Sequence, residues 1–364
     1  MWQRVLMWLR SRFRKPPELG VTYTPPSDTG PDTTDSEKTD PTVVPIERVV
    51  TPTPMTEGRM ERPELKQGAK GPDVLTLQKL LVANGEGMTP DGDFGPGTAK
   101  AVSSFQQSYG LAVTGIADAS TWRVLDRPAF GKDPTLQGLA MTPPTPLNGT
   151  SSVVQSWNQY GGLLLELSGR LGFDPALSIA VLLTESAGKG FASDGRMIIR
   201  FENHIFYSQW GKANPDVFNA HFKFDPNQRW LGHFWRPDAG EWQPLHTKTS
   251  GQNAEWAVLA FARTLADEAA LRSISMGAPQ VMGFNCLKIG LSSAREMFDT
   301  WSKGDRPQVL GLFDFIRSNH RMVRALRGND LVGFARYYNG EGQAEVYGDH
   351  IDDNRKAAKA AGVP

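Results

Sequence analysis

Two proline-rich stretches divide this 364-residue chain into parts that are expected to fold separately. Ten prolines lie from Pro16 to Pro63, among threonines and acidic residues, and four more lie between residues 133 and 152. Such segments bury too little apolar surface to offset the loss of chain entropy, so they predict linkers. The resulting division is a terminal segment (1–15), a linker (16–62), a small domain (63–128), a second linker (129–150) and a large domain (151–364).

The overall charge narrows the classes of partner that the protein binds. The chain has 39 Lys and Arg against 39 Asp and Glu, so it lacks the basic excess typical of nucleic-acid-binding proteins. Cys286 is the single cysteine, which rules out an intramolecular disulfide. Because the sequence has no apolar run of about 18 residues, it predicts no transmembrane helix. We expect a monomer that binds no nucleic acid and needs no metal ion or other cofactor.

The first fifteen residues differ in character from the rest. They contain five basic and no acidic residues, and on a helix their apolar side chains share one face. This pattern predicts a basic amphipathic helix suited to an anionic membrane surface; the alternative is a frayed terminus with no role. No small-residue cleavage site follows, so the pattern does not indicate a cleaved signal peptide. The apolar face consists of Trp2, Val5, Leu6, Leu9 and Phe13.

The small domain shows three short helical patterns separated by glycine-containing turns. Gly85 is expected to end the first helix, Thr98 to cap the second, and Ser120 or Thr121 to cap the third. About 65 residues in three helices predict a bundle near the lower size limit for independent folding. A pattern of core, turn and cap residues runs through the whole stretch and consists of Leu65, Gly68, Gly71, Val74, Leu77, Gln78, Leu81, Gly85, Asp91, Gly92, Phe94, Gly95, Thr98, Ala101, Val102, Phe105, Gln106, Gly110, Leu111, Gly115, Thr121 and Leu125. By this pattern the stretch closely resembles the peptidoglycan-binding module of cell-wall hydrolases, which implies that it binds bacterial peptidoglycan.

The large domain is predicted to be mostly α, because five of its segments show 3.6-residue periodicity. One interruption follows the helix that ends near Ser186, where Asp194-Gly195 is a strong turn signal between short apolar segments. It predicts a short β-hairpin in which residues 197–201 form the better strand. The expected fold class is therefore mostly α, with a three-helix bundle followed by a helical domain that carries a short β-hairpin.

Hydrolytic chemistry is expected from carboxylates, because the chain has no HExxH metal motif and no GxSxG nucleophile motif. Glu185 is the carboxylate that stands out. Asp174 and Pro175 are suited to begin its helix and the AGKG after Ser186 to end it, which places Glu185 in the last turn. The negative end of the helix dipole and apolar neighbours both raise the pKa of a carboxyl group there. A carboxylic acid that stays protonated near neutral pH is suited to protonate a glycosidic oxygen.

Two later segments carry further polar side chains that are candidates for the site. The first is a glycine-rich loop that presents Gln280, with Pro279 at an expected helix start. The second ends a helix with Tyr338 and Asn339. We predict that Gln280 and Asn339 hydrogen-bond sugar hydroxyl or acetamido groups and that Tyr338 contacts Glu185. The alternatives are a helix-capping amide for Gln280 and a core side chain for Tyr338.

These segments occur in the order E-S, G-x-x-Q and Y-N-G, which resembles the motif set of the lysozyme-like superfamily. The finer resemblance is to the N-acetylmuramidase family of phage endolysins and related bacterial proteins, over nearly all of residues 151–364. Ala187 is a departure, since the family commonly has a second small, glycine-like residue there. The matching residues are Glu185, Ser186, Gly188, Gly190, Phe191, Gly195, Arg196, Ile199, Phe201, Glu202, His204, Phe206, Gly277, Gln280, Met282, Gly283, Phe284, Asn285, Tyr338, Asn339 and Gly340.

The resemblance implies an endolysin-like muramidase that cleaves the bond between N-acetylmuramic acid and N-acetylglucosamine, with Glu185 as general acid. Glu202 is predicted to be a second catalytic carboxylate that positions or activates water, and Asp194 is the runner-up. The alternative for Glu202 is a structural ion pair with Arg196 or Arg200. A separation of about 6.5 to 9.5 Å between the two catalytic carboxyl groups would indicate an inverting hydrolase.

Two other functions stay open on the sequence alone. A lytic transglycosylase needs only the acid and forms anhydromuramic ends, and a non-catalytic wall-binding or tail-structural protein would keep the fold without the reaction. For an enzyme of phage, prophage or bacterial origin, we expect synthesis in the host cytoplasm without a cleavable signal peptide. A holin or another export route would then bring it to the cell wall in the periplasm.

Overall fold

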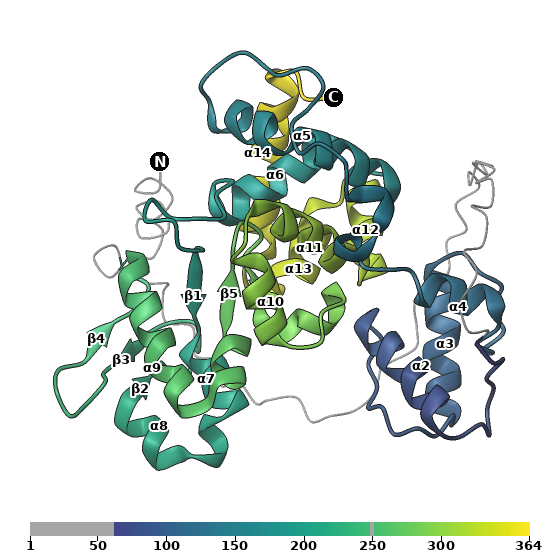
Figure 1. Cartoon of the computed structure of the whole chain (residues 1–364), viewed down its shortest axis with the longest axis horizontal. Helices are drawn as coiled ribbons and strands as arrows, with labels where there is room; N and C mark the ends of the chain where they lie inside the picture. The colour runs from purple at the N-terminus through teal and green to yellow at the C-terminus, as the bar shows by residue number, and fades with distance from the viewer. Residues whose placement is uncertain (1–61, 248–250) are drawn as a thin grey trace, which may run out of the picture. The chain divides into compact units, whose positions relative to one another are not determined.

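The computed structural model describes residues 62–247 and 251–364. The amphipathic helix expected at residues 1–15 and nearly all of the linker expected at 16–62 lie outside these residues. Within the described part of the chain, no helix is both long and apolar enough to cross a membrane. As predicted, the described residues are mostly helical with small antiparallel sheets (Figure 1).

Helices α2 (Pro72–Ala83), α3 (Pro96–Ser108) and α4 (Ala119–Leu125) form the predicted three-helix bundle around their own core. Two buried glutamines, Gln78 and Gln106, each form hydrogen bonds that hold one turn of the bundle. The Gln78 amide donates to Asp91 Oδ1 at 2.8 Å and its carbonyl accepts from Gly92 N at 2.8 Å. Gln106 binds the turn at Thr114 in the same way, donating to the side chain and accepting from the backbone N–H. The shared hydrogen-bond arrangement of the two turns therefore explains why glutamine occurs at both places in the sequence pattern.

The helix caps of the bundle differ from the expectation at two places. The α3 helix begins at Pro96, so Thr98 lies inside its first turn, where it is buried and accepts from Gln78 Nε2 at 3.0 Å. The cap of α4 is Asp118, whose carboxylate accepts from Thr121 N at 2.8 Å, rather than Ser120 or Thr121. Asp118, two residues before Ser120, competes well for this position, because its carboxylate also complements the positive end of the helix dipole.

A second, larger core joins the helices that follow. Part of the stretch expected to be a linker belongs to it, since Phe130 and Leu136 are buried there and Phe130 N donates to both oxygens of Asp314 at 3.0 Å. These helices are α5 (Ser152–Leu171), α6 (Pro175–Ser186), α7 (Asn203–Gln209), α8 (Pro215–His221), α9 (Gly251–Arg272), α10 (Ala294–Trp301), α11 (Asp305–Arg317), α12 (His320–Arg327), α13 (Leu331–Asn339) and α14 (Ala344–Ala360).

Helix α6 lies at the centre of this part of the molecule. Its residues from Ala176 to Leu183 are all buried, as expected for a helix that is apolar on every side. It packs against α5 and α14, and α14 packs in turn against α13 (Figure 1). The end of α6 is thereby held beside the end of α13.

Two three-stranded antiparallel sheets accompany the helices. One has the order β1 (Ile199–Phe201), β5 (Ile274–Met276), β6 (Val281–Met282), and the other has the order β2 (Phe222–Lys223), β3 (Phe234–Trp235), β4 (Gln243–Pro244). The expected hairpin at Asp194-Gly195 is reduced to one bridge, Phe191 to Met197. The better strand pairs with β5 instead, with Arg200 opposite Ser275, because a distant strand covers its apolar face more completely than the short segment before the turn.

Candidate functional site

The candidate general acid, Glu185, lies in the last turn of α6. Asp174 caps the start of this helix, as predicted, by accepting from Ala176 N at 2.9 Å. The helix ends at Ser186, and the next residue, Ala187, has a left-handed backbone with φ 54°. Burial raises the pKa of the Glu185 carboxyl group to about 7, against the effect of a hydrogen bond from Asn339. The direction agrees with the one expected from the sequence.

The three sequence motifs meet through side-chain hydrogen bonds. Asn339 Nδ2, at the end of α13, donates to Glu185 Oε1 at 3.0 Å. Its neighbour Tyr338 donates to the carbonyl oxygen of Pro279 at 2.7 Å, in the loop between β5 and β6. The hydrogen bond to Glu185 thus comes from Asn339, where the sequence suggested a contact from Tyr338. The pKa of Tyr338 is raised, mainly by burial and further by the charge on Glu185.

The side chain of Gln280 is bound within its own loop. Its Nε2 donates to Gly277 O at 2.7 Å and its Oε1 accepts from Ser275 Oγ at 2.8 Å. The loop is a tight turn between β5 and β6, so Pro279 does not begin a helix as expected. Gln280 itself has φ 50°, a conformation that the two side-chain bonds stabilise. The observed amide therefore braces the turn, and sugar binding by Gln280 stays a prediction.

Glu202, the predicted second carboxylate, directly precedes α7. Arg200 Nε donates to its Oε1 at 2.8 Å, which is one of the ion pairs considered from the sequence. Burial alone would raise the pKa of Glu202, but the neighbouring ring of His204 and the charge on Arg200 outweigh it and lower the pKa to about 2. Asp194, the runner-up, pairs with Arg196 at 2.6 Å in an exposed turn.

Three residues near these carboxylates were not predicted from the sequence. Tyr347, in α14, has a pKa raised to about 12 by burial and then by the charge on Glu185, and the charge on Glu202 acts on it in the same direction. His233 and His246 lie beside Glu202. The available signal was the crowding of histidines, since four of the six lie between residues 204 and 246.

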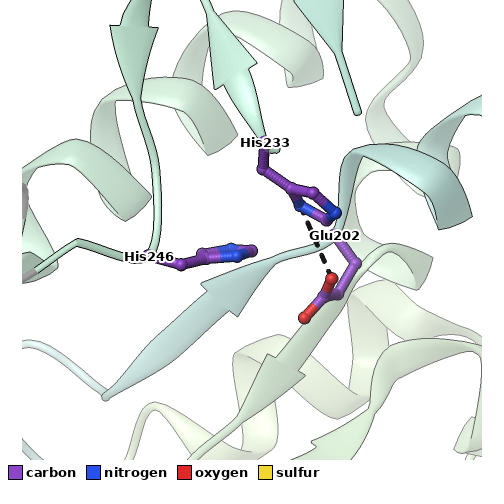
Figure 2. A group of neighbouring side chains, drawn as sticks. All are labelled: Glu202, His233 and His246. Atoms are coloured by element: carbon purple, nitrogen blue, oxygen red, sulfur yellow. Dashed lines mark ion pairs between the residues drawn. The ribbon is translucent and has the colours of Figure 1, made fainter. Parts of the chain in front are cut away.

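Glu202, His233 and His246 form a cluster that could hold a metal ion (Figure 2). One potential ligand atom from each residue lies within 4.8 Å of the other two. His233 is buried, and its Nδ1 lies 3.6 Å from Glu202 Oε2. Burial lowers the pKa of both histidines, that of His246 to about 3. Neutral imidazoles and an ionised carboxylate are therefore the states expected near neutral pH.

Comparisons with known proteins match both parts of the described chain. The model of the N-acetylmuramidase family matches residues 174–358, and that of the putative peptidoglycan binding domain matches residues 70–125. A spore cortex-lytic enzyme of Bacillus cereus is 44% identical over 63 residues, which are 17% of this chain and 24% of that protein. The chain thus spans about a quarter of the length of the curated relatives it matches.

Two solved structures are also similar. The Burkholderia AP3 phage endolysin is 28% identical, with 82% of this chain and 100% of that chain covered and a TM-score of 0.43. The SleB N-terminal domain is 40% identical, with 18% of this chain and 93% of that chain covered and a TM-score of 0.18.

Proposed function

The chain belongs to the N-acetylmuramidase family, and from this premise we propose that it is a glycoside hydrolase that cleaves peptidoglycan between N-acetylmuramic acid and N-acetylglucosamine. Glu185 is the general acid that protonates the glycosidic oxygen. Its pKa of about 7 carries the proposal, because a carboxyl group with this pKa keeps a transferable proton at the pH where it must act.

The neighbours of Glu185 support this role. Because Asn339 donates to Oε1, the proton resides on Oε2, and the carboxyl group is held in one orientation. The hydrogen bond from Tyr338 to Pro279 O ties the end of α13 to the β5–β6 turn, so the residue that orients Glu185 is itself held. Asn339 is exposed, which leaves its remaining N–H for the predicted bond to a sugar substituent.

The predicted role of Glu202 as second carboxylate stays a prediction. Its ionised state suits stabilisation of positive charge on the sugar, and the effect of both Glu185 and Glu202 on Tyr347 supports a common neighbourhood. The ion pair with Arg200, however, occupies one of its oxygens. This engagement favours the lytic transglycosylase as the second candidate function, since that reaction needs the acid alone.

The residues that match the peptidoglycan-binding model support a second contact with the same polymer. A bound module raises the local concentration of substrate without altering the catalytic site. Deleting residues 63–128 should therefore weaken lysis of whole sacculi more than cleavage of short soluble oligomers. Equal losses on both substrates would show instead that the module supports the catalytic fold.

We propose that the protein acts on the cell wall in the periplasm, where its proposed substrate lies. Membrane binding by residues 1–15 stays a prediction, because this segment lies outside the described residues. It is tested by co-sedimentation of the full chain with anionic vesicles at low and high salt, against a chain that starts at Pro17. Indistinguishable binding by the two chains would leave the segment without this role.

The products of digestion test the proposed reaction. Purified peptidoglycan is digested with the full chain, and the soluble muropeptides are identified by mass spectrometry. Hydrolysis leaves reducing N-acetylmuramic acid ends, which is the expected result. Anhydromuramic ends would replace the hydrolase by the transglycosylase, and a lack of soluble products at every pH would leave a wall-binding protein.

A further inference from the structure

The cluster of Glu202, His233 and His246 joins segments that are distant in the sequence. Glu202 lies between β1 and α7, His233 directly precedes β3, and His246 follows β4 (Figure 2). The rings of His233 and His246 pack against each other, with their centroids 4.6 Å apart. Two polar atoms of the cluster, Glu202 Oε2 and His233 Nδ1, are buried and have no hydrogen-bond partner among the described residues.

Backbone carbonyl groups determine which ring nitrogens are protonated. His233 Nε2 lies 2.7 Å from Arg229 O, and His246 Nε2 lies 2.8 Å from Phe201 O. Since a carbonyl oxygen only accepts hydrogen bonds, both Nε2 atoms must carry the proton, and each neutral ring keeps its lone pair on Nδ1. Metal-binding histidines typically have this arrangement, in which the second ring N–H donates to a carbonyl or carboxylate and orients the ring.

This assignment leaves two acceptors facing each other. His233 Nδ1, with its lone pair, lies 3.6 Å from Glu202 Oε2, and His204 Nδ1 lies 3.4 Å from the same oxygen. Both distances exceed the normal N–H···O range of about 2.7 to 3.2 Å. Two ligands about 2.1 Å from a tetrahedral zinc ion, in contrast, lie about 3.4 Å apart. The spacing therefore fits a shared cation better than a direct hydrogen bond.

We propose that Glu202, His233 and His246 bind a Zn²⁺ ion, with His204 beside the fourth coordination position. Two imidazoles and one carboxylate oxygen are a donor set that suits zinc among the common divalent ions, whereas calcium and magnesium prefer oxygen alone. Arg200 binds the other oxygen of Glu202, which leaves Oε2 as a single ligand atom. This site differs from the sequence expectation that the protein needs no metal ion.

The surroundings of the cluster indicate what the ion does. Strands β2, β3 and β4 have two residues each, so this sheet has little hydrogen bonding of its own. Zinc bound to His233 and His246 would connect it to Glu202, which directly follows the edge strand β1 of the other sheet, and so act as a cross-link. His204, beside the cluster, also lines a pocket of about 490 Å³.

Metal binding by the full chain tests the site directly. Bound metal is removed from the protein with EDTA, Zn²⁺ is added, and unbound Zn²⁺ is removed by dialysis. The zinc that stays bound is measured by inductively coupled plasma mass spectrometry. One equivalent is expected, and His233→Gln and His246→Gln should each weaken binding by at least tenfold. The matched control, His320→Gln, changes a histidine of α12 outside the cluster and should bind as the parent does. Less than a tenth of an equivalent, or equal binding by all four chains, would overturn the proposal.

A second readout covers variants that fold poorly. Co²⁺ in place of Zn²⁺ should give the visible absorption of a tetrahedral site in the parent chain, and Zn²⁺ but not Mg²⁺ should raise its melting temperature. Equal stabilisation of the parent and both cluster variants would refute a site at these residues. Glu185→Gln should bind one equivalent like the parent, so metal binding is scored independently of whether the proposed hydrolysis is correct.

Discussion

Glu185 and Glu202 are two partly buried glutamates with opposite acid–base behaviour. Burial raises the pKa of Glu185 to about 7, whereas His204 and Arg200 overcome burial and lower the pKa of Glu202 to about 2. The first lies at the C-terminal end of α6 and the second directly precedes α7, so the two helix dipoles act on them in opposite directions. Burial alone therefore does not decide the charge of a carboxyl group; the groups around it do.

The difference separates two kinds of chemistry. Glu185 accepts a hydrogen bond from the neutral amide of Asn339 and keeps a proton that it can transfer. Glu202 faces a guanidinium and imidazole rings, and is suited to bind a cation. A pair of catalytic carboxyl groups also consists of one protonated acid and one ionised partner. Measurements are therefore needed to separate these two roles of Glu202.

The largest expected effect is the loss of lysis in Glu185→Gln. The amide has the shape of the carboxyl group but no acidic proton, and general acid catalysis contributes about 10² to 10⁴-fold. Turbidity of peptidoglycan suspensions measures the rate, and co-sedimentation checks that wall binding is kept. Glu166→Gln, which changes a glutamate paired with Arg170 on α5, is the control and should retain full activity. More than a few per cent of activity in Glu185→Gln would remove this residue from the acid role.

Local signals predicted most of the helical parts of the fold, although the caps of α3 and α4 and the helix start at Pro279 were predicted wrongly. The cap at Asp174, the end of α6 and the mostly helical class follow from residues close together in the sequence. The pairing of β1 with β5 did not follow, because the partner lies more than seventy residues away and a strand of three residues carries little register information. The same reason explains why Phe130 was assigned to a linker, since the carboxylate that binds its N–H is Asp314.

The candidate site was predictable only in part. The order of the motifs indicated Glu185 and Asn339, and these side chains do meet. It also suggested a contact of Tyr338 with Glu185 and an open amide for Gln280, yet both groups bind backbone carbonyls instead. Such choices depend on differences of about 1 kcal/mol between competing hydrogen bonds, which spacing in a sequence does not resolve.

The stability of the same Glu185→Gln chain should depend on pH. The folded pKa of about 7 lies above the ordinary value of 4.5, so the native carboxyl group stabilises the fold below pH 4.5 and loses this contribution as the pH rises through 7. Urea unfolding should find the variant about 2 kcal/mol more stable than the parent at pH 8 and equal to it near pH 4.5. A variant that is less stable at pH 8 would contradict the raised pKa.

Glu202→Gln should have the opposite sign in the same measurement. Removing the carboxylate leaves Arg200 without its ionised partner and should cost about 2 kcal/mol at pH 8, measured in EDTA so that metal binding does not contribute. The exposed pair of Glu166 with Arg170 is the matched control, and Glu166→Gln should change stability by less than about 0.5 kcal/mol. Equal gains in Glu185→Gln and Glu202→Gln would erase the contrast between the two carboxylates.

Asn339→Ala should sharpen the contrast by moving the pKa of Glu185 further upward. Activity should fall as the pH rises through the pKa of Glu185, because the acid then loses its proton; this fall is the basic limb of the pH–activity profile. The hydrogen bond from Asn339 lowers this pKa, so its loss should shift the basic limb to higher pH. Without this hydrogen bond the carboxyl group is held less firmly in one orientation, so the rate of lysis should also fall about tenfold. Asn354→Ala is the control, because Asn354 donates to Thr184 Oγ1 at 3.0 Å and not to Glu185. A limb that moves in both variants would indicate a general effect of α6 packing.

The smallest expected effect comes from Ala187→Gly, at the end of the helix that carries Glu185. Ala187 has φ 54°, a conformation that destabilises a residue with a Cβ by about 1 kcal/mol and that glycine adopts freely. Glycine also increases the entropy of the unfolded chain, which offsets part of the stability gained. Urea unfolding should therefore show a stabilisation of about 0.5 kcal/mol. Because the substitution changes neither the burial of Glu185 nor its bond to Asn339, the basic limb should stay where it is. A shifted limb without a gain in stability would mean that the geometry of the helix end, and not burial, controls the pKa of the acid.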